Sequence, residues 1–149
     1  MEEHLRVAVG SDDTYSLAEY VVKYLEKRGF RVIRVGALKT GKPYPWPLVG
    51  KEVGELVANG RASWGVVICY TGTGVSISAN KIRGVRAALC PDAETARGAR
   101  LWNDANVLAL SARLTTEYKA REILDTWIAV QEIDKSEEDN IKLLKELDK

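Results

Sequence analysis

The sequence predicts an α/β fold of three layers, a Rossmann-like arrangement in which helices cover both faces of a five-stranded parallel sheet. Short apolar runs alternate with longer amphipathic segments along the whole chain, which is the pattern of successive β-α-β units. The run over 66–69 is apolar and rich in β-branched residues, as expected of a central parallel strand. The 149 residues fit one domain of typical size. We therefore expect a single domain over 1–149 that ends in an extra helix.

Turn residues and apolar periodicity mark the predicted elements. Strands are expected over 5–9, 31–35, 66–69, 85–89 and 106–110. Helices are expected from Ser16 to just before Gly29, from about Ser76, and over 48–57, 93–101, 116–131 and about 136–148. The pairs Ser16/Glu19 and Ser136/Asp139 have the spacing of residues that cap a helix N-terminus. The segment 39–47 holds three prolines and is expected to be a loop.

Charge and composition exclude several classes of protein. The 22 basic and 21 acidic residues nearly cancel, so no overall field attracts nucleic acid or an anionic membrane. The longest apolar run, over 64–70, is far shorter than the roughly 20 residues of a membrane-spanning helix. The first four residues carry no apolar leader, and the two cysteines form no C-x-x-C pair. We expect a cytoplasmic protein without disulfides or a cysteine-based zinc site, and assign no role to His4.

Polar residues that follow the strands define a candidate site. In an open parallel sheet, ligands bind beyond the carboxyl ends of the strands, where the strand order reverses. If the order is 2-1-3-4-5, the reversal lies between the first and third strands. The polar segments that leave this edge of the sheet are 11–13, 69–74, 91–92 and 111–113.

The residues of these segments allow more than one interpretation. The threonine-glycine repeat over 71–74 opens a helix, so its N–H groups either bind an anion or serve only a tight turn. Cys69, just before a helix N-terminus, is either a catalytic thiolate, with its pKa lowered by the helix dipole, or an inert buried residue. Cys90 is interpreted as structural. Asp12 and Asp13 either form an acid/base or metal-binding pair or cap the next helix. Arg113 is suited to binding a phosphate or carboxylate.

A longer run of residues around this repeat resembles a known enzyme family. The chain reads ICYTGTGVSISANK over 68–81 and GVRAALC over 84–90. The ribose-5-phosphate isomerase B / galactose-6-phosphate isomerase family carries I-C-G-T-G-x-G-x-S-I-A-A-N-K followed by G-I-R-A-A-L-C. Further matches are Gly10-Ser11-Asp12, the run NDANVLA over 103–109, and Ala112-Arg113. They follow the family order over roughly residues 5–131.

The resemblance implies an aldose–ketose isomerase that converts a sugar phosphate of the ribose 5-phosphate/ribulose 5-phosphate type through an enediolate, without a metal or organic cofactor. It also implies a homodimer, often paired into tetramers, with active sites between subunits. Cys69 matches the cysteine that moves a proton between C1 and C2, and Thr71 matches a residue that assists at the sugar oxygens. The other matched positions bind the enediolate (Gly72, Thr73, Gly74 and Ser76), the sugar (Asp12 and Asn103) and the phosphate (Arg113).

Several positions depart from the family pattern and bear on the substrate. Asp13 replaces a histidine on the phosphate side, and its carboxylate would repel a phosphate dianion. Trp102 replaces the histidine that opens the furanose ring, and an indole exchanges no proton at neutral pH. Tyr70 replaces a glycine, and Trp46 stands in Pro-Trp-Pro where the family has D-Y-P. These three aromatic side chains are suited to stacking on a sugar or apolar ligand. Residues 131–149 contain no arginine, whereas the family's C-terminal segment supplies arginines to the phosphate.

These departures leave two alternatives to catalysis by this chain alone. One is a non-catalytic protein that binds a sugar or another metabolite in the same crevice. The other is one subunit of a hetero-oligomeric isomerase whose partner supplies the missing histidines and arginines. Under each hypothesis the expected ligand is a small sugar or sugar phosphate, and no nucleic acid or membrane partner is expected.

Overall fold

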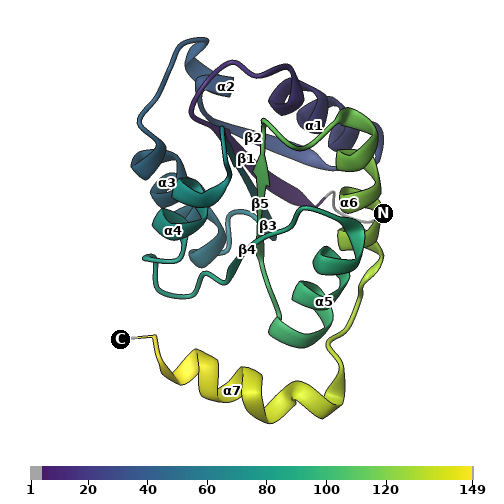
Figure 1. Ribbon diagram of the computed structural model, residues 1–149. Coiled ribbons are helices and arrows are strands. Elements are labelled where there is room, and N and C mark those ends of the chain that lie inside the picture. Colours follow the sequence, from purple (N-terminus) through teal and green to yellow (C-terminus); the bar gives the residue numbers. More distant parts are fainter. Residues whose placement is uncertain (1–4, 149) are drawn as a thin grey trace.

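A computed structural model describes residues 5–148, so His4 lies outside the described part of the chain. It contains one parallel sheet of five strands (Figure 1). These strands are β1 (Arg6–Ser11), β2 (Arg31–Gly36), β3 (Trp64–Cys69), β4 (Ala87–Leu89) and β5 (Val107–Ser111). Every neighbouring pair in the sheet is parallel. The predicted α/β class is confirmed.

The strand order is β2-β1-β3-β5-β4, so the order 2-1-3-4-5 is wrong. All five residues of β5 are buried, whereas the three residues of β4 are only partly buried. The buried strand therefore lies inside the sheet, and the short strand forms its edge. The reversal between β1 and β3 is unaffected, and the candidate crevice keeps its predicted place.

Helices cover both faces of the sheet, as predicted. Figure 1 shows α1 (Ser16–Lys27), α5 (Ala93–Asn103) and α6 (Glu117–Ala129) on one face, with α3 (Trp46–Ala58) and α4 (Thr73–Ala79) on the other. Each face has its own buried apolar core. Successive side chains of a strand point to opposite faces, so Ile68 packs in the core beneath α1 and Cys69 in the core beneath α3 and α4.

α1 starts at Ser16 as predicted, but its N-terminus is not capped as predicted. Tyr15 is the N-cap residue and makes no side-chain capping bond, so the capping box of Ser16 and Glu19 is wrong. The Glu19 carboxylate instead accepts a hydrogen bond from the Arg34 guanidinium on β2 (2.7 Å). The Glu19 side chain thus makes an ion pair with a neighbouring strand and not a local capping bond. The predicted end of the helix is confirmed, because Gly29 follows it with a φ of 96°.

Two further segments also differ from the prediction. The chain forms a short helix, α2 (Ala37–Thr40), at the start of the proline-rich segment. Near the C-terminus, the Asp134 carboxylate, rather than Ser136, caps a 3-10 helix (Lys135–Glu137) that leads into α7 (Glu138–Glu146). α7 lies apart from both helical layers (Figure 1). Of its apolar side chains only one is buried, Ile141, whereas three are exposed: Leu143, Leu144 and the following Leu147.

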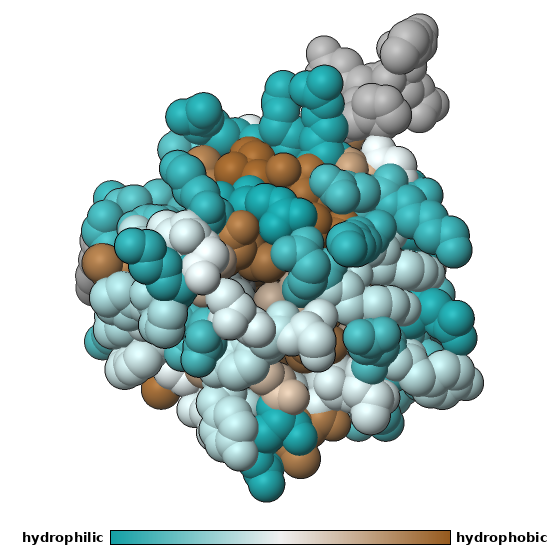
Figure 2. Space-filling model, turned by 90° about the horizontal axis from the view of Figure 1, so that it is seen from above, coloured by the Kyte–Doolittle hydropathy of each residue, from teal (hydrophilic) through white to brown (hydrophobic). Residues whose placement is uncertain are grey.

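The surface is mixed in character. Seen from above, it is mainly hydrophilic, with one larger patch of apolar side chains and several small ones (Figure 2). Within residues 5–148, no helix combines the length and the apolar composition that crossing a membrane requires.

Candidate active site

The segments that follow β1, β3 and β5 lie side by side at the carboxyl edge of the sheet. On one side of β3, the Asp12 N–H donates to the Ile68 carbonyl (3.2 Å). On the other side, the Ala112 N–H donates to the Cys69 carbonyl (2.9 Å). The β1 and β5 segments therefore flank Cys69, as the predicted crevice requires.

The Cys69 thiol is held by the turn that follows it. Cys69 is buried, and its Sγ accepts a hydrogen bond from the Gly72 N–H (3.2 Å). Gly72 has a φ of 79°, and a Cβ at this position would lie 2.6 Å from Leu89 Cδ1. The turn therefore requires glycine for its backbone conformation and for space. The sulfur at the carboxyl end of β3 therefore meets a backbone N–H donor.

The first turn of α4 places further donors beside the thiol. Ser76 makes the first bond of the helix, from its N–H to the Gly72 carbonyl (3.3 Å). The N–H groups of Gly74 and Val75 come before this bond and have no carbonyl within the helix. The hydroxyls of Thr71 and Thr73 bind each other (2.7 Å). The turn therefore presents two amides and a pair of hydroxyls at the end of β3.

Trp46, the first residue of α3, packs against this turn. A Cβ on Gly74 would lie 2.9 Å from the indole Cε3 and 3.1 Å from Cδ2, so the ring lies directly on the glycine backbone. The Ser78 hydroxyl of α4 donates to the Trp46 carbonyl (3.5 Å). Trp46 is nevertheless 46% exposed. The indole therefore packs against the turn over 71–74, and the rest of its surface is exposed to solvent.

The segment after β1 holds Asp12 and Asp13 in different environments. The exposed Asp13 accepts a hydrogen bond from the Thr14 N–H (2.8 Å), just before α1. Asp12 Oδ1 is shielded from solvent and has no hydrogen-bond partner in the described part of the chain. Burial raises the pKa of the Asp12 carboxyl, with a smaller rise from Asp13, while the Tyr15 hydroxyl lowers it. Neither carboxylate forms the cap of α1, whose N-cap is Tyr15.

Tyr70 and Arg113 lie at the rim of the same edge. The Tyr70 carbonyl accepts from the Arg113 N–H (3.0 Å) and the Ser111 hydroxyl (3.0 Å), while 60% of the Tyr70 surface is exposed. Within residues 5–148, no side chain pairs with the exposed Arg113 guanidinium. Arg113 is therefore available to bind an anion from solution.

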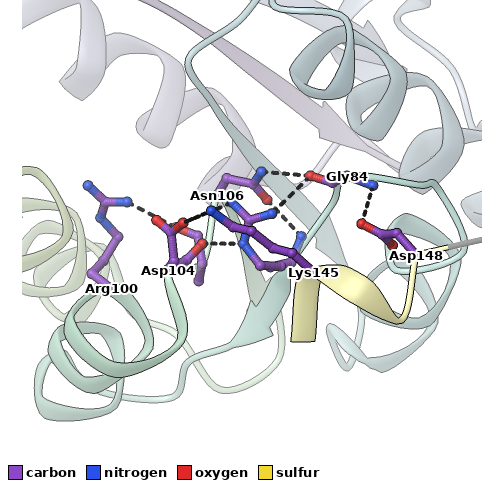
Figure 3. Close-up of polar contacts among 8 residues, drawn as sticks. Gly84, Arg100, Asp104, Asn106, Lys145 and Asp148 are labelled. Carbon is purple, nitrogen blue, oxygen red and sulfur yellow. Dashed lines mark hydrogen bonds and ion pairs between the residues drawn. The ribbon is translucent and has the colours of Figure 1, made fainter. Parts of the chain in front are cut away.

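Trp102 and Asn103 are not brought to this site within one chain. They end α5, just before β5, whereas Cys69 lies level with Ser111 at the other end of that strand. Asn103 instead lines a cavity of about 460 Å³ between the start of β4 and α7. Figure 3 shows the contacts there: Asp104 Oδ2 pairs with Lys145 of α7 (3.0 Å), and Asp148 accepts from the Gly84 N–H (3.0 Å). Within one chain, these two predicted binding residues therefore lie at the opposite edge of the sheet from Cys69.

Two other residues complete the comparison with the sequence. Cys90 is fully buried, and burial raises the pKa of its thiol to about 12, which agrees with a structural role. Tyr15 was not singled out from the sequence, yet its hydroxyl interacts with the Asp12 carboxylate. The capping box expected at Ser16 assigns no function to the residue before it, so the sequence pattern offers no signal for Tyr15.

Comparison with known proteins identifies the family of the chain. Residues 7–144 match the Ribose/Galactose Isomerase family. Ribose-5-phosphate isomerase B of Escherichia coli is 35% identical over 127 residues, 85% of this chain and 85% of that protein. Galactose-6-phosphate isomerase subunit LacB of Clostridium acetobutylicum is 37% identical over 128 residues, 86% of this chain and 72% of that protein.

A solved structure extends the likeness to the fold. Ribose-5-phosphate isomerase B of Clostridium thermocellum superposes with a TM-score of 0.89 at 36% identity, covering 96% of this chain and 97% of that one. The resemblance found in the sequence is thus confirmed over nearly the whole chain. This chain belongs to the ribose/galactose isomerase family of sugar-phosphate isomerases.

Proposed function

We propose that this protein interconverts an aldose and a ketose phosphate of the ribose 5-phosphate/ribulose 5-phosphate type through an enediolate, with Cys69 as the proton-transfer residue. The observation that carries the proposal is the bond from the Gly72 N–H to Cys69 Sγ at the end of the central strand. It joins a base and a set of donors in one turn, and enolisation needs both.

The reaction follows from the positions of these groups. In the aldose-to-ketose direction, the Cys69 thiolate takes the proton from C2, and the electron pair of that bond forms the C1–C2 double bond. The C1 oxygen becomes negative and is stabilised by the free N–H groups of Gly74 and Val75. Thr71 carries the proton of the C2 hydroxyl to the C1 oxygen, and Cys69 returns its proton to C1. No proton is gained or lost overall.

The remaining polar residues are proposed to hold the substrate. Asp12 accepts hydrogen bonds from sugar hydroxyls, and the unpaired Arg113 guanidinium binds the phosphate. Tyr70 and Trp46 form aromatic walls for the carbon chain. Asp13, whose carboxylate accepts from the Thr14 N–H, is given no role in binding the phosphate.

We also propose that the working unit is a homodimer with its sites between subunits, or a tetramer of two such dimers. Trp102 and Asn103 lie at the opposite sheet edge from Cys69 in their own chain, so only a partner can bring them to the substrate. Several large apolar side chains are exposed and available for such an interface, including Leu48, Tyr70 and Ile77.

The two free cysteines support a reducing, cytoplasmic location.

Turnover tests the proposal. Purified protein is assayed for conversion of ribose 5-phosphate to ribulose 5-phosphate, with Cys69→Ala and, as matched control, Cys90→Ala. Loss of the base is expected to lower kcat by a factor of about 10² to 10⁴. The control keeps kcat unchanged, because Cys90 lies in the other apolar core. Equal activity in wild type and Cys69→Ala contradicts the proposed mechanism.

A further inference from the structure

The β1–α1 segment holds a carboxylate fixed beside the thiol. The backbone of Asp12 is held on both sides, by its N–H bond to the Ile68 carbonyl (3.2 Å) and by the Tyr44 N–H bond to its own carbonyl (2.9 Å). Its Oδ1 is closed off from solvent and has no partner among residues 5–148. Since Ile68 directly precedes Cys69, the backbone of Asp12 is held next to the end of β3 that carries the thiol.

Tyr15 supplies a hydroxyl to the same carboxylate. The tyrosine is half-buried at the start of α1, three residues after Asp12, and its hydroxyl is close enough to the Asp12 carboxylate for each group to shift the pKa of the other. Burial is the main cause that raises the pKa of Tyr15, and Asp12 adds to it, so the phenol keeps its proton at neutral pH. A protonated hydroxyl next to a carboxylate can give one proton while its neighbour takes another.

The neighbouring hydroxyls and the second carboxylate of this edge bind one another or the backbone. The Asp13 carboxylate accepts from the Thr14 N–H (2.8 Å), and the hydroxyls of Thr71 and Thr73 bind each other (2.7 Å). The Ser11 hydroxyl donates to the Asp13 carbonyl (2.7 Å). Tyr15 and Asp12 therefore form a donor–acceptor pair that is separate from the Thr71 and Thr73 hydroxyls and from the Asp13 carboxylate.

We propose that Tyr15 and Asp12 open the furanose ring of the sugar phosphate before Cys69 acts on it. This inference rests on the proposed function, because only an isomerase that meets a cyclic sugar needs the step. A furanose opens when its ring oxygen gains a proton and the hydroxyl on its anomeric carbon loses one. The bond between that carbon and the ring oxygen then breaks, and its electron pair stays on the oxygen.

The pair of residues balances these transfers. The Tyr15 hydroxyl gives its proton to the ring oxygen, and the Asp12 carboxylate takes the proton of the anomeric hydroxyl, which becomes the aldehyde oxygen. That proton then passes from Asp12 to the Tyr15 phenolate. Both side chains return to their starting state, and no other reactant is consumed.

A substrate without a ring separates this role from a structural one. In an aldotetrose 4-phosphate, the phosphate occupies the hydroxyl that would close a five-membered ring, so the sugar stays open. Turnover of ribose 5-phosphate and of erythrose 4-phosphate is measured for wild type, Tyr15→Phe and Cys69→Ala. Tyr20→Phe is the matched control, because it removes a hydroxyl from the same helix and Tyr20 stacks on Tyr24, away from the site.

The expected result is a difference between the two substrates. Tyr15→Phe lowers kcat for ribose 5-phosphate by a factor of about 10² and leaves erythrose 4-phosphate within about twofold of wild type. Cys69→Ala loses both activities, Tyr20→Phe loses neither, and both Tyr→Phe variants keep the thermal unfolding midpoint of wild type.

Two results overturn the ring-opening role alone. An equal loss on both substrates in Tyr15→Phe shows a structural effect, and an unchanged rate on ribose 5-phosphate shows that the hydroxyl takes no part. A wild-type protein that converts only erythrose 4-phosphate is an isomerase without ring opening, which also overturns the inference. If wild type converts neither sugar, the proposed function fails and this inference fails with it.

Discussion

Gly72 supplies the backbone N–H that donates a hydrogen bond to the Cys69 thiol of the candidate site. The residue turns the chain through a left-handed conformation, and its N–H reaches back to Cys69 Sγ three residues earlier. The space beside it is closed by Leu89 Cδ1 and by the Leu110 carbonyl carbon, at 2.6 Å and 2.9 Å from an added Cβ. The sequence predicts a turn at this threonine-glycine repeat. It does not predict the hydrogen bond from the Gly72 N–H to Cys69 Sγ, because that bond depends on how the turn packs against β5.

Substituting this glycine is expected to damage stability and activity together. Gly72→Ala adds a left-handed penalty of about 1–2 kcal/mol and a steric term of about 1–3 kcal/mol. Gly41→Ala is the matched control, since Gly41 has a φ of 78° and nothing within 4 Å of an added Cβ, so only the conformational penalty applies. Urea unfolding measures both variants. Equal losses of unfolding free energy would show that the contacts of Gly72 do not matter.

The elements around the site are held in place by packing that the sequence pattern reveals only in part. Alternating apolar runs predicted all five strands and the helices that cross over between them. The position of β5 inside the sheet was missed because the pattern gives strand identity and not neighbours. The start of α1 at Ser16 is predicted correctly, but its capping box is not formed, and Glu19 binds Arg34 of β2, a contact between segments distant in sequence. Local rules fail where tertiary contacts compete with them.

The contact between α3 and α4 allows a test at the scale of elements. Gly74→Ala is expected to destabilise the protein by about 1–3 kcal/mol, because the added Cβ meets the Trp46 ring at 2.9 Å. In a Trp46→Ala background the same substitution costs less, because the ring is absent. A double-mutant cycle by urea unfolding measures this coupling. If the losses of unfolding free energy from the two substitutions are additive, the Trp46 ring and Gly74 are not energetically coupled.

The whole molecule explains why part of the predicted site is missing from a single chain. The sequence places Asn103 and Trp102 next to a strand, but β5 runs in parallel with β3, so its start and the Cys69 end of β3 lie at opposite edges. Motif matching cannot show this separation, since it records order along the chain and not position in space. We propose that a second copy closes the distance, which makes the site a property of the dimer.

Mixed dimers test this arrangement. Cys69→Ala and Asn103→Ala chains are each expected to be nearly inactive, and dissociating and reassembling an equal mixture is expected to restore about a quarter of wild-type activity. Half of the dimers formed are then mixed, and each has one of its two sites built from intact residues. A mixture no more active than its components contradicts a site shared between subunits.

The central claim, that Cys69 moves a proton at C2 of a sugar phosphate, is tested most directly by hydrogen exchange. The protein is incubated in heavy water with ribose 5-phosphate and followed by NMR, beside the Cys69→Ala variant. We predict that deuterium enters C2 of the recovered aldose with wild type and that the variant slows its entry by a factor of about 10² or more. Deuterium entry at the same rate in both proteins would contradict the claim.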